Sequence, residues 1–99
     1  MGEEIKGDDL KRVLEMEAIL DKARELLDIL EENIVRLKEF QPEVSRLEAY
    51  YTSPQWRKDF NADEKGMFPE GLKRGVLSED GIYDLLERNK EILEALKGL

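Results

Sequence analysis

The chain has 99 residues, of which 40% are apolar and 40% charged, and its formal net charge is −8. This length fits one domain, and a charged fraction above the roughly 25% of average globular proteins favours a thin helical protein with much surface. The negative charge disfavours direct binding to nucleic acids and to anionic membranes. The sequence contains no cysteine and no histidine, which excludes disulfides, a thiol nucleophile and the commonest metal ligand.

The N-terminal segment 1–7 is polar and contains two glycines, so we expect a disordered tail. Asp8 or Asp9 is the expected N-cap of the helix that follows, because a short carboxylate accepts hydrogen bonds from the first free amides. The chain shows neither a signal peptide nor an apolar run of transmembrane length, which together with the missing cysteines predicts a cytoplasmic protein.

Apolar residues then recur at alternating steps of three and four, which is an a/d heptad repeat over about four heptads. The repeat consists of Val13, Met16, Leu20, Ala23, Leu27, Leu30, Ile34 and Leu37. It predicts one amphipathic helix over residues 8–40, about 48 Å long at 1.5 Å per residue. A helix of this length needs either a partner helix within the chain or a second molecule, and the sequence leaves both open.

Pro42 predicts a kink or short break at 40–42, because proline lacks an amide hydrogen and clashes with the carbonyl four residues earlier. The apolar pattern continues beyond it, so the helix is expected to resume until about residue 51. Ser53 followed by Pro54 is a typical helix start and predicts a short helix over 54–62 that buries aromatic residues.

The segment 63–77 holds three glycines and a proline but also several apolar residues, so we expect a loop that packs against the rest. Ser78 is the expected N-cap of a last helix that ends near residue 97. The predicted fold is therefore all-α, with 1–99 as one domain. In it, the long kinked N-terminal helix packs antiparallel to the C-terminal helix, and the short helix and packed loop lie between them.

The stretch from Leu47 to Leu86 contains the most distinctive motifs. The paired tyrosines Tyr50-Tyr51 and the segment from Leu72 to Tyr83 resemble a family of small bacterial proteins known as "domain of unknown function 4298". Members of this family are about as long as this chain and begin with a long amphipathic helix. The resemblance implies a bacterial cytoplasmic protein and implies no activity.

Aromatic and basic residues in this stretch suggest a protein-binding surface, because tyrosine and tryptophan are favoured in binding hot spots. Lys73 and Arg74 form a basic pair just before a predicted helix start. As an alternative to binding, one tyrosine lies in the core with the other at its edge, and Lys73 or Arg74 pairs with Glu79 and Asp80 to fix the turn. The predicted surface comprises Tyr50, Tyr51, Trp56, Lys73, Arg74 and Tyr83.

Catalytic and metal-binding patterns are weak. Asp59, Asn61, Asp63 and Glu70 have the spacing of a calcium loop, but Glu64 stands where that loop needs a glycine. No pairing of a nucleophile with a base and no phosphate-binding loop stands out. We therefore expect no metal, no cofactor and no enzymatic activity.

The expected function is that of a non-enzymatic protein–protein interaction module, such as a small adaptor, regulator or inhibitor. Two alternatives remain open at this point. The protein could be a structural homo-oligomer, for example a homodimer, built on the helix over 8–40. It could also be an acidic mimic of nucleic acid that blocks a basic protein surface.

Overall fold

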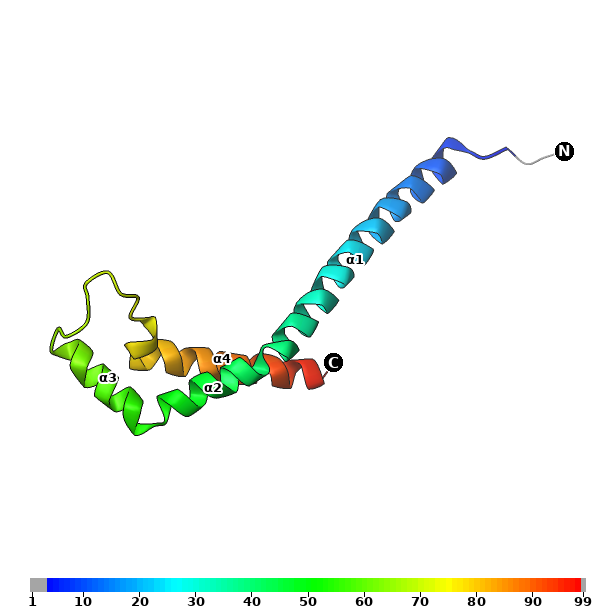
Figure 1. Cartoon of the computed structure of the whole chain (residues 1–99). Coiled ribbons are helices and arrows are strands. Elements are labelled where there is room, and N and C mark those ends of the chain that lie inside the picture. Colours follow the sequence, from blue (N-terminus) through cyan, green and yellow to red (C-terminus); the bar gives the residue numbers. More distant parts are fainter. Residues whose placement is uncertain (1–3, 99) are drawn as a thin grey trace. The chain divides into compact units, whose positions relative to one another are not determined.

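The computed structural model describes residues 4–98, which form two compact units, one ending at Phe40 and the other beginning at Gln41. The described part of the chain contains helices and no strand, so the predicted all-α class is confirmed (Figure 1). The elements are α1 (Gly7–Glu39), α2 (Gln41–Tyr51), α3 (Pro54–Glu64), the short 3-10 helix η1 (Gly75–Leu77) and α4 (Glu79–Lys97).

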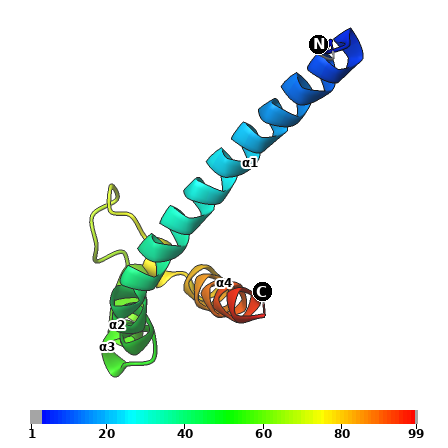
Figure 2. The same ribbon diagram turned by 90° about the vertical axis from the view of Figure 1, so that its right-hand side faces the viewer.

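The first unit consists of α1, a single uninterrupted helix of 33 residues (Figure 1, Figure 2). Its start differs from the prediction. The N-cap position is Lys6, which makes no capping bond with its side chain, so the expected cap at Asp8 or Asp9 is wrong. Asp8 and Asp9 lie in the first turn of the helix, after the N-cap, where the positive end of the helix dipole favours acidic side chains. Of the predicted tail, residues 1–3 lie outside the described residues and Gly7 is already helical.

The predicted interruption before Pro42 is confirmed. α1 ends at Glu39, and Phe40 is a turn residue whose backbone N–H donates to the carbonyl of Arg36. Pro42 is the second residue of α2, where the missing amide hydrogen would have had no partner within the helix. The break therefore coincides with the boundary between the two units.

In the second unit α2 packs against α4, while α3 and η1 connect them at one end. Gln41 at the start of α2 is hydrogen-bonded to Asn89, in the middle of α4. Leu47, nearly two turns later, lines a groove with Ile82 in the first turn of α4. The residue numbers run in opposite directions, so α4 has the antiparallel packing that was predicted for the C-terminal helix, and its partner is α2.

The second helix start follows the prediction. Ser53 is the N-cap of α3, its hydroxyl accepts the N–H of Trp56, and Pro54 takes the first helical position. α3 runs two residues further than expected, to Glu64. It ends in a Schellman motif with Gly66 at a φ of 71°, in which the N–H of Met67 donates to the carbonyl of Ala62.

The last helix also begins and ends as predicted. Ser78 is the N-cap of α4, and its hydroxyl accepts the N–H of Gly81. The core of this unit consists of Trp56, Leu77 and Ile82. The expected packed loop is packed only in part, because Met67 at its start is 71% exposed.

Candidate functional site

Trp56 lies at the centre of the second unit, where α2, α3 and η1 meet. It is 3% exposed, and its ring N–H donates to the carbonyl of Val76 at 2.8 Å. The ring of Tyr51 meets it edge-on at 5.1 Å, and the ring of Phe60 stacks on it at 5.2 Å. Trp56 is therefore a core residue of α3 that contacts both α2 and η1, and its indole is not available to a partner.

A hollow of about 400 Å³ lies beside this aromatic cluster. The guanidinium of Arg57 sits 5.4 Å from the Trp56 ring and 3.9 Å from the carboxylate of Glu79. The two aliphatic hydroxyls of the hollow are used locally, since Thr52 donates to the carbonyl of Glu48 and Ser53 to that of Tyr50. The residues that line it are Tyr51, Thr52, Ser53, Pro54, Trp56, Arg57 and Glu79.

Tyr50 is half-buried and connects α2 to α3. Its hydroxyl donates to Asp59 at 2.6 Å, and the side chain of Gln55 donates to the second carboxylate oxygen at 2.9 Å. Burial, aided by this hydrogen bond and by the charge of Asp59, raises the pKa of Tyr50 to about 12. The hydrogen bonds from Tyr50 and Gln55 lower the pKa of Asp59. At neutral pH the phenol is thus a protonated donor and the carboxylate its ionised acceptor.

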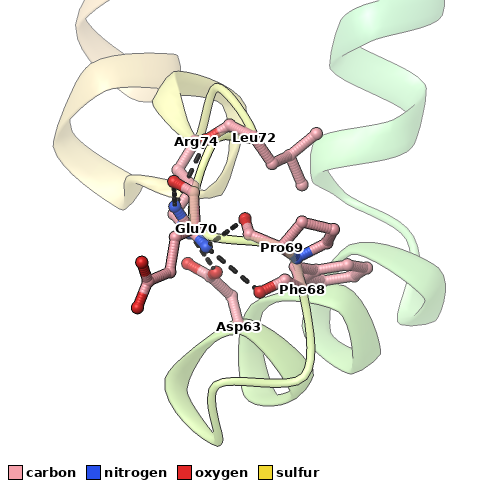
Figure 3. A network of polar contacts seen from close by, with 6 residues as sticks. All are labelled: Asp63, Phe68, Pro69, Glu70, Leu72 and Arg74. Atoms are coloured by element: carbon pink, nitrogen blue, oxygen red, sulfur yellow. Dashed lines mark hydrogen bonds and ion pairs between the residues drawn. The ribbon is translucent and has the colours of Figure 1, made fainter.

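Arg74 holds the loop between α3 and η1 (Figure 3). Its Nε donates to the carboxylate of Asp63, which makes a half-buried ion pair. Its two terminal nitrogens donate to four loop carbonyls at 2.8–3.4 Å. Those carbonyls belong to Phe68, Pro69, Glu70 and Leu72. Since a guanidinium has five N–H donors, this network occupies all of them.

The alternative in which the basic pair binds Glu79 and Asp80 is wrong for Arg74. Glu79 and Asp80 lie in the first turn of α4, and Arg74 is bonded instead to Asp63. Asp63 is eleven residues away and reaches Arg74 because the intervening loop folds back, a proximity that no helical spacing reveals. Lys73 is exposed and has no ion-pair partner within residues 4–98.

The six residues of the predicted surface therefore have different environments. Tyr51 and Trp56 pack together, Tyr50 is bonded to α3 and Arg74 to the loop. Lys73 and Tyr83 are exposed, the latter by 53%.

One polar contact between α2 and α4 was not foreseen. Gln41 and Asn89 form a reciprocal pair in which each amide donates to the other, at 2.9 and 3.1 Å. Asn89 was visible in the sequence as the single polar residue on the apolar face of the last helix. Its partner lies 48 residues away, so only the fold reveals the pair.

A second candidate surface is the apolar stripe of α1, by which we mean the eight a and d residues of its heptad repeat. No residue of α1 is buried. Within the stripe, Val13, Leu27 and Leu30 are 50–57% exposed. Ile34 and Leu37, at its C-terminal end, are half-buried. The stripe extends over nearly the whole helix and consists of Val13, Met16, Leu20, Ala23, Leu27, Leu30, Ile34 and Leu37.

Membrane spans and metal sites are absent from the part of the chain that the structure describes. No helix within residues 4–98 combines the length and the hydrophobicity that a bilayer crossing needs. In the same range no three acidic side chains are grouped so that they could hold a metal ion. Asp59, Asn61 and Asp63, which have calcium-loop spacing, lie on the helix α3.

Comparison with known proteins gives one match. The family described as Domain of unknown function (DUF4298) matches residues 13–97, which include most of α1 and the whole second unit up to the end of α4. No curated protein and no solved structure matched the chain.

Proposed function

The chain belongs to the family described as Domain of unknown function (DUF4298), and from this premise we propose that it is a non-enzymatic protein-interaction module whose binding element is α1. It acts as a small adaptor, regulator or inhibitor in the bacterial cytoplasm. Because the family description carries no activity, the support for this proposal comes from the geometry of the chain itself.

The observation that carries the proposal is the apolar stripe, exposed at six of its eight positions, on a helix without a single buried residue. Helices in water owe most of their stability to the burial of an apolar face, and a contiguous exposed apolar patch is typical of an interaction site. Burying one leucine or valine contributes about 1.5–3 kcal/mol, so a partner that covers the stripe gains several such terms.

The groups that could serve catalysis support a non-enzymatic role. Tyr50 and Asp59 have shifted pKa values, but they are bonded to each other across two helices. The hydroxyls of Thr52 and Ser53 donate to backbone carbonyls. The sequence offers neither histidine nor cysteine to complete a nucleophilic site.

A photoreactive amino acid placed on α1 tests the proposal in living cells. We would introduce it at Leu20, within the apolar stripe, and at Ala18, which is exposed on the opposite side of the same helix. The proposal predicts covalent protein adducts from position 20 and few from position 18. Equal yields from the two positions, or no adduct from either, would overturn it.

The surface predicted from the aromatic and basic residues needs a separate test. Substitution of Trp56 would disturb the core, and substitution of Arg74 would release the loop, so neither variant isolates binding. Lys73→Ala and Tyr83→Ala remove exposed side chains and leave the core intact. If this surface contributes to binding, both variants weaken capture of whatever protein the photoreactive residue identifies.

A further inference from the structure

We infer that the partner of α1 is α1 of a second copy of the chain, and that the two helices lie antiparallel with apolar stripe against apolar stripe. This inference rests on the proposed function, because it names the partner of the same surface. Four properties of α1 support it, namely its length, the area of its stripe, the distribution of its charges and the pairing of its residues on reversal.

Length is the first property. α1 has 33 residues and the next longest helix, α4, has 19. At 1.5 Å per residue these correspond to about 50 Å and about 28 Å. No helix of the second unit is long enough to cover the apolar stripe from end to end, whereas a second copy supplies a stripe of equal length.

The area of the stripe is sufficient for a specific dimer. A buried aliphatic side chain removes roughly 60–120 Å² from water, as its transfer free energy and the usual area coefficient imply. The six positions from Leu20 to Leu37 on each of two helices would then bury on the order of 1,000 Å², which reaches the size of a specific interface. The flanking residues Ile19 and Leu26, 60% and 55% exposed, add to this area.

The charges of α1 are distributed so that two copies do not repel along the stripe. In heptad notation the stripe fills positions a and d, and the rows at e and g flank it. The e row is neutral in sum and alternates in sign, with Glu17, Arg24, Glu31 and Lys38. None of these four has an ion-pair partner within residues 4–98, whereas Lys22 and Arg36 pair within the helix with Glu25 and Glu32 on its outer face.

When the second copy runs antiparallel, each row that flanks the stripe lies beside the same row of the other copy. In an antiparallel pair the two e rows lie side by side, as do the two g rows. Because the e row alternates, reversal offers Glu17 of one copy to Lys38 of the other and Arg24 to Glu31. The g row consists of Arg12, Ile19, Leu26 and Asn33, so it carries no acidic residue and is apolar at its two middle positions.

The small residue of the stripe points to the same orientation. In the antiparallel alignment that sets Glu17 beside Lys38, Ala23 lies opposite Ile34 of the other copy, so a small side chain faces a large one. A parallel pair would place Ala23 against Ala23 and the charges of Arg24 and Glu31 beside the apolar residues of the g row. Uniform filling of the interface therefore favours the antiparallel pair.

Sedimentation equilibrium on the full chain tests the association at two concentrations a hundredfold apart. We expect a mass twice that of the 11.5 kDa chain at the higher concentration. Leu27→Glu, within the stripe, should abolish the dimer, and Ala18→Glu, which adds the same charge on the outer side, should leave it unchanged. A wild-type monomer at both concentrations, or equal effects of the two variants, would overturn the inference.

Charge reversal tests the orientation. Glu17→Lys and Lys38→Glu should each raise the dimer dissociation constant roughly two- to tenfold, as expected for exposed ion pairs. The double variant should restore the wild-type value. Residues 17 and 38 are about 31 Å apart along one helix, so restoration can arise only between copies in antiparallel alignment. Failure of the double variant to recover would refute the antiparallel pairing.

The two proposals can fail separately. If the chain is monomeric but the photoreactive residue at Leu20 still captures another protein, self-association is refuted and the proposed function stands. If position 20 captures nothing, the proposed function fails as well. Throughout these experiments the near-ultraviolet signal of Trp56, the single tryptophan, reports that the second unit remains folded.

Discussion

At the scale of residues, the side chains that stand out in the sequence differ in how they are used. Tryptophan is frequent in binding hot spots because it is large and has one polar atom, and the same properties suit it to a core where that atom finds an acceptor. In this chain the acceptor is the carbonyl of Val76, so Trp56 stabilises the second unit.

Trp56→Phe should therefore lower stability. The hydrogen bond to the carbonyl of Val76 is lost, and a typical hydrogen bond within a protein contributes about 0.5–1.5 kcal/mol. The smaller ring also leaves a void between Tyr51 and Phe60. Urea unfolding followed by far-ultraviolet circular dichroism measures the loss. Tyr83→Phe, at an exposed aromatic residue, is the control and should change stability by less than about 0.5 kcal/mol.

Tyr50 gives the second unit a dependence on alkaline pH. Its pKa is about 12 in the folded protein and 10.0 for an ordinary tyrosine, so the contribution of the protonated phenol is complete below pH 10 and is lost as the pH rises towards 12. Asp59 has a lowered pKa in the folded protein and acts in the other direction. The stability that its ionised carboxylate contributes is lost as the pH falls and the carboxylate is protonated. The stability difference between wild type and Tyr50→Phe should therefore shrink at both extremes. A difference that stays constant from neutral pH to pH 12 would contradict this account.

At the scale of elements, the sequence predicted those boundaries that local chemistry determines. Pro42, the pair Ser53-Pro54 and Ser78 mark helix starts or breaks through atoms of the residues themselves, and the structure places boundaries at all three. Contacts between distant residues were not predictable in this way. The amide pair of Gln41 and Asn89 and the ion pair of Asp63 and Arg74 depend on how the chain folds back.

The end of α3 offers a test at this scale. Gly66 has a φ of 71°, which residues with a Cβ atom rarely adopt, and its carbonyl-capping turn closes the helix. Gly66→Ala should reduce the stability of the second unit by about 1 kcal/mol. Gly71→Ala in the same loop is the matched control, because an added Cβ there meets no atom within 4 Å. Equal losses in the two variants would show that the backbone conformation at Gly66 is not the cause.

At the scale of the whole molecule, the two units differ in how they are stabilised. The second unit has its own core around Trp56, Leu77 and Ile82, whereas no residue of α1 is buried. A helix that lacks burial in its own chain depends on a partner for most of its stability. The helix content of α1 should therefore depend on protein concentration, and the fold of the second unit should not.

Dilution of the wild-type protein tests this difference. The far-ultraviolet helical signal should fall on dilution, while the near-ultraviolet signal of Trp56 should remain constant. In Leu27→Glu the helical signal should be low and independent of concentration. If both signals of the wild-type protein were to fall together, the two units would not be stabilised independently.

The hydrogen bonds of Arg74 have a consequence for engineering the chain. The ten-residue loop around it is where a designer would first try to insert a tag or expect a protease to cut, because exposed loops tolerate both. Here one guanidinium fixes Asp63 and four loop carbonyls, so any added residue has to break a network that closes the loop on itself. Insertions belong elsewhere, and trypsin should cut after Arg74 only when the loop has opened.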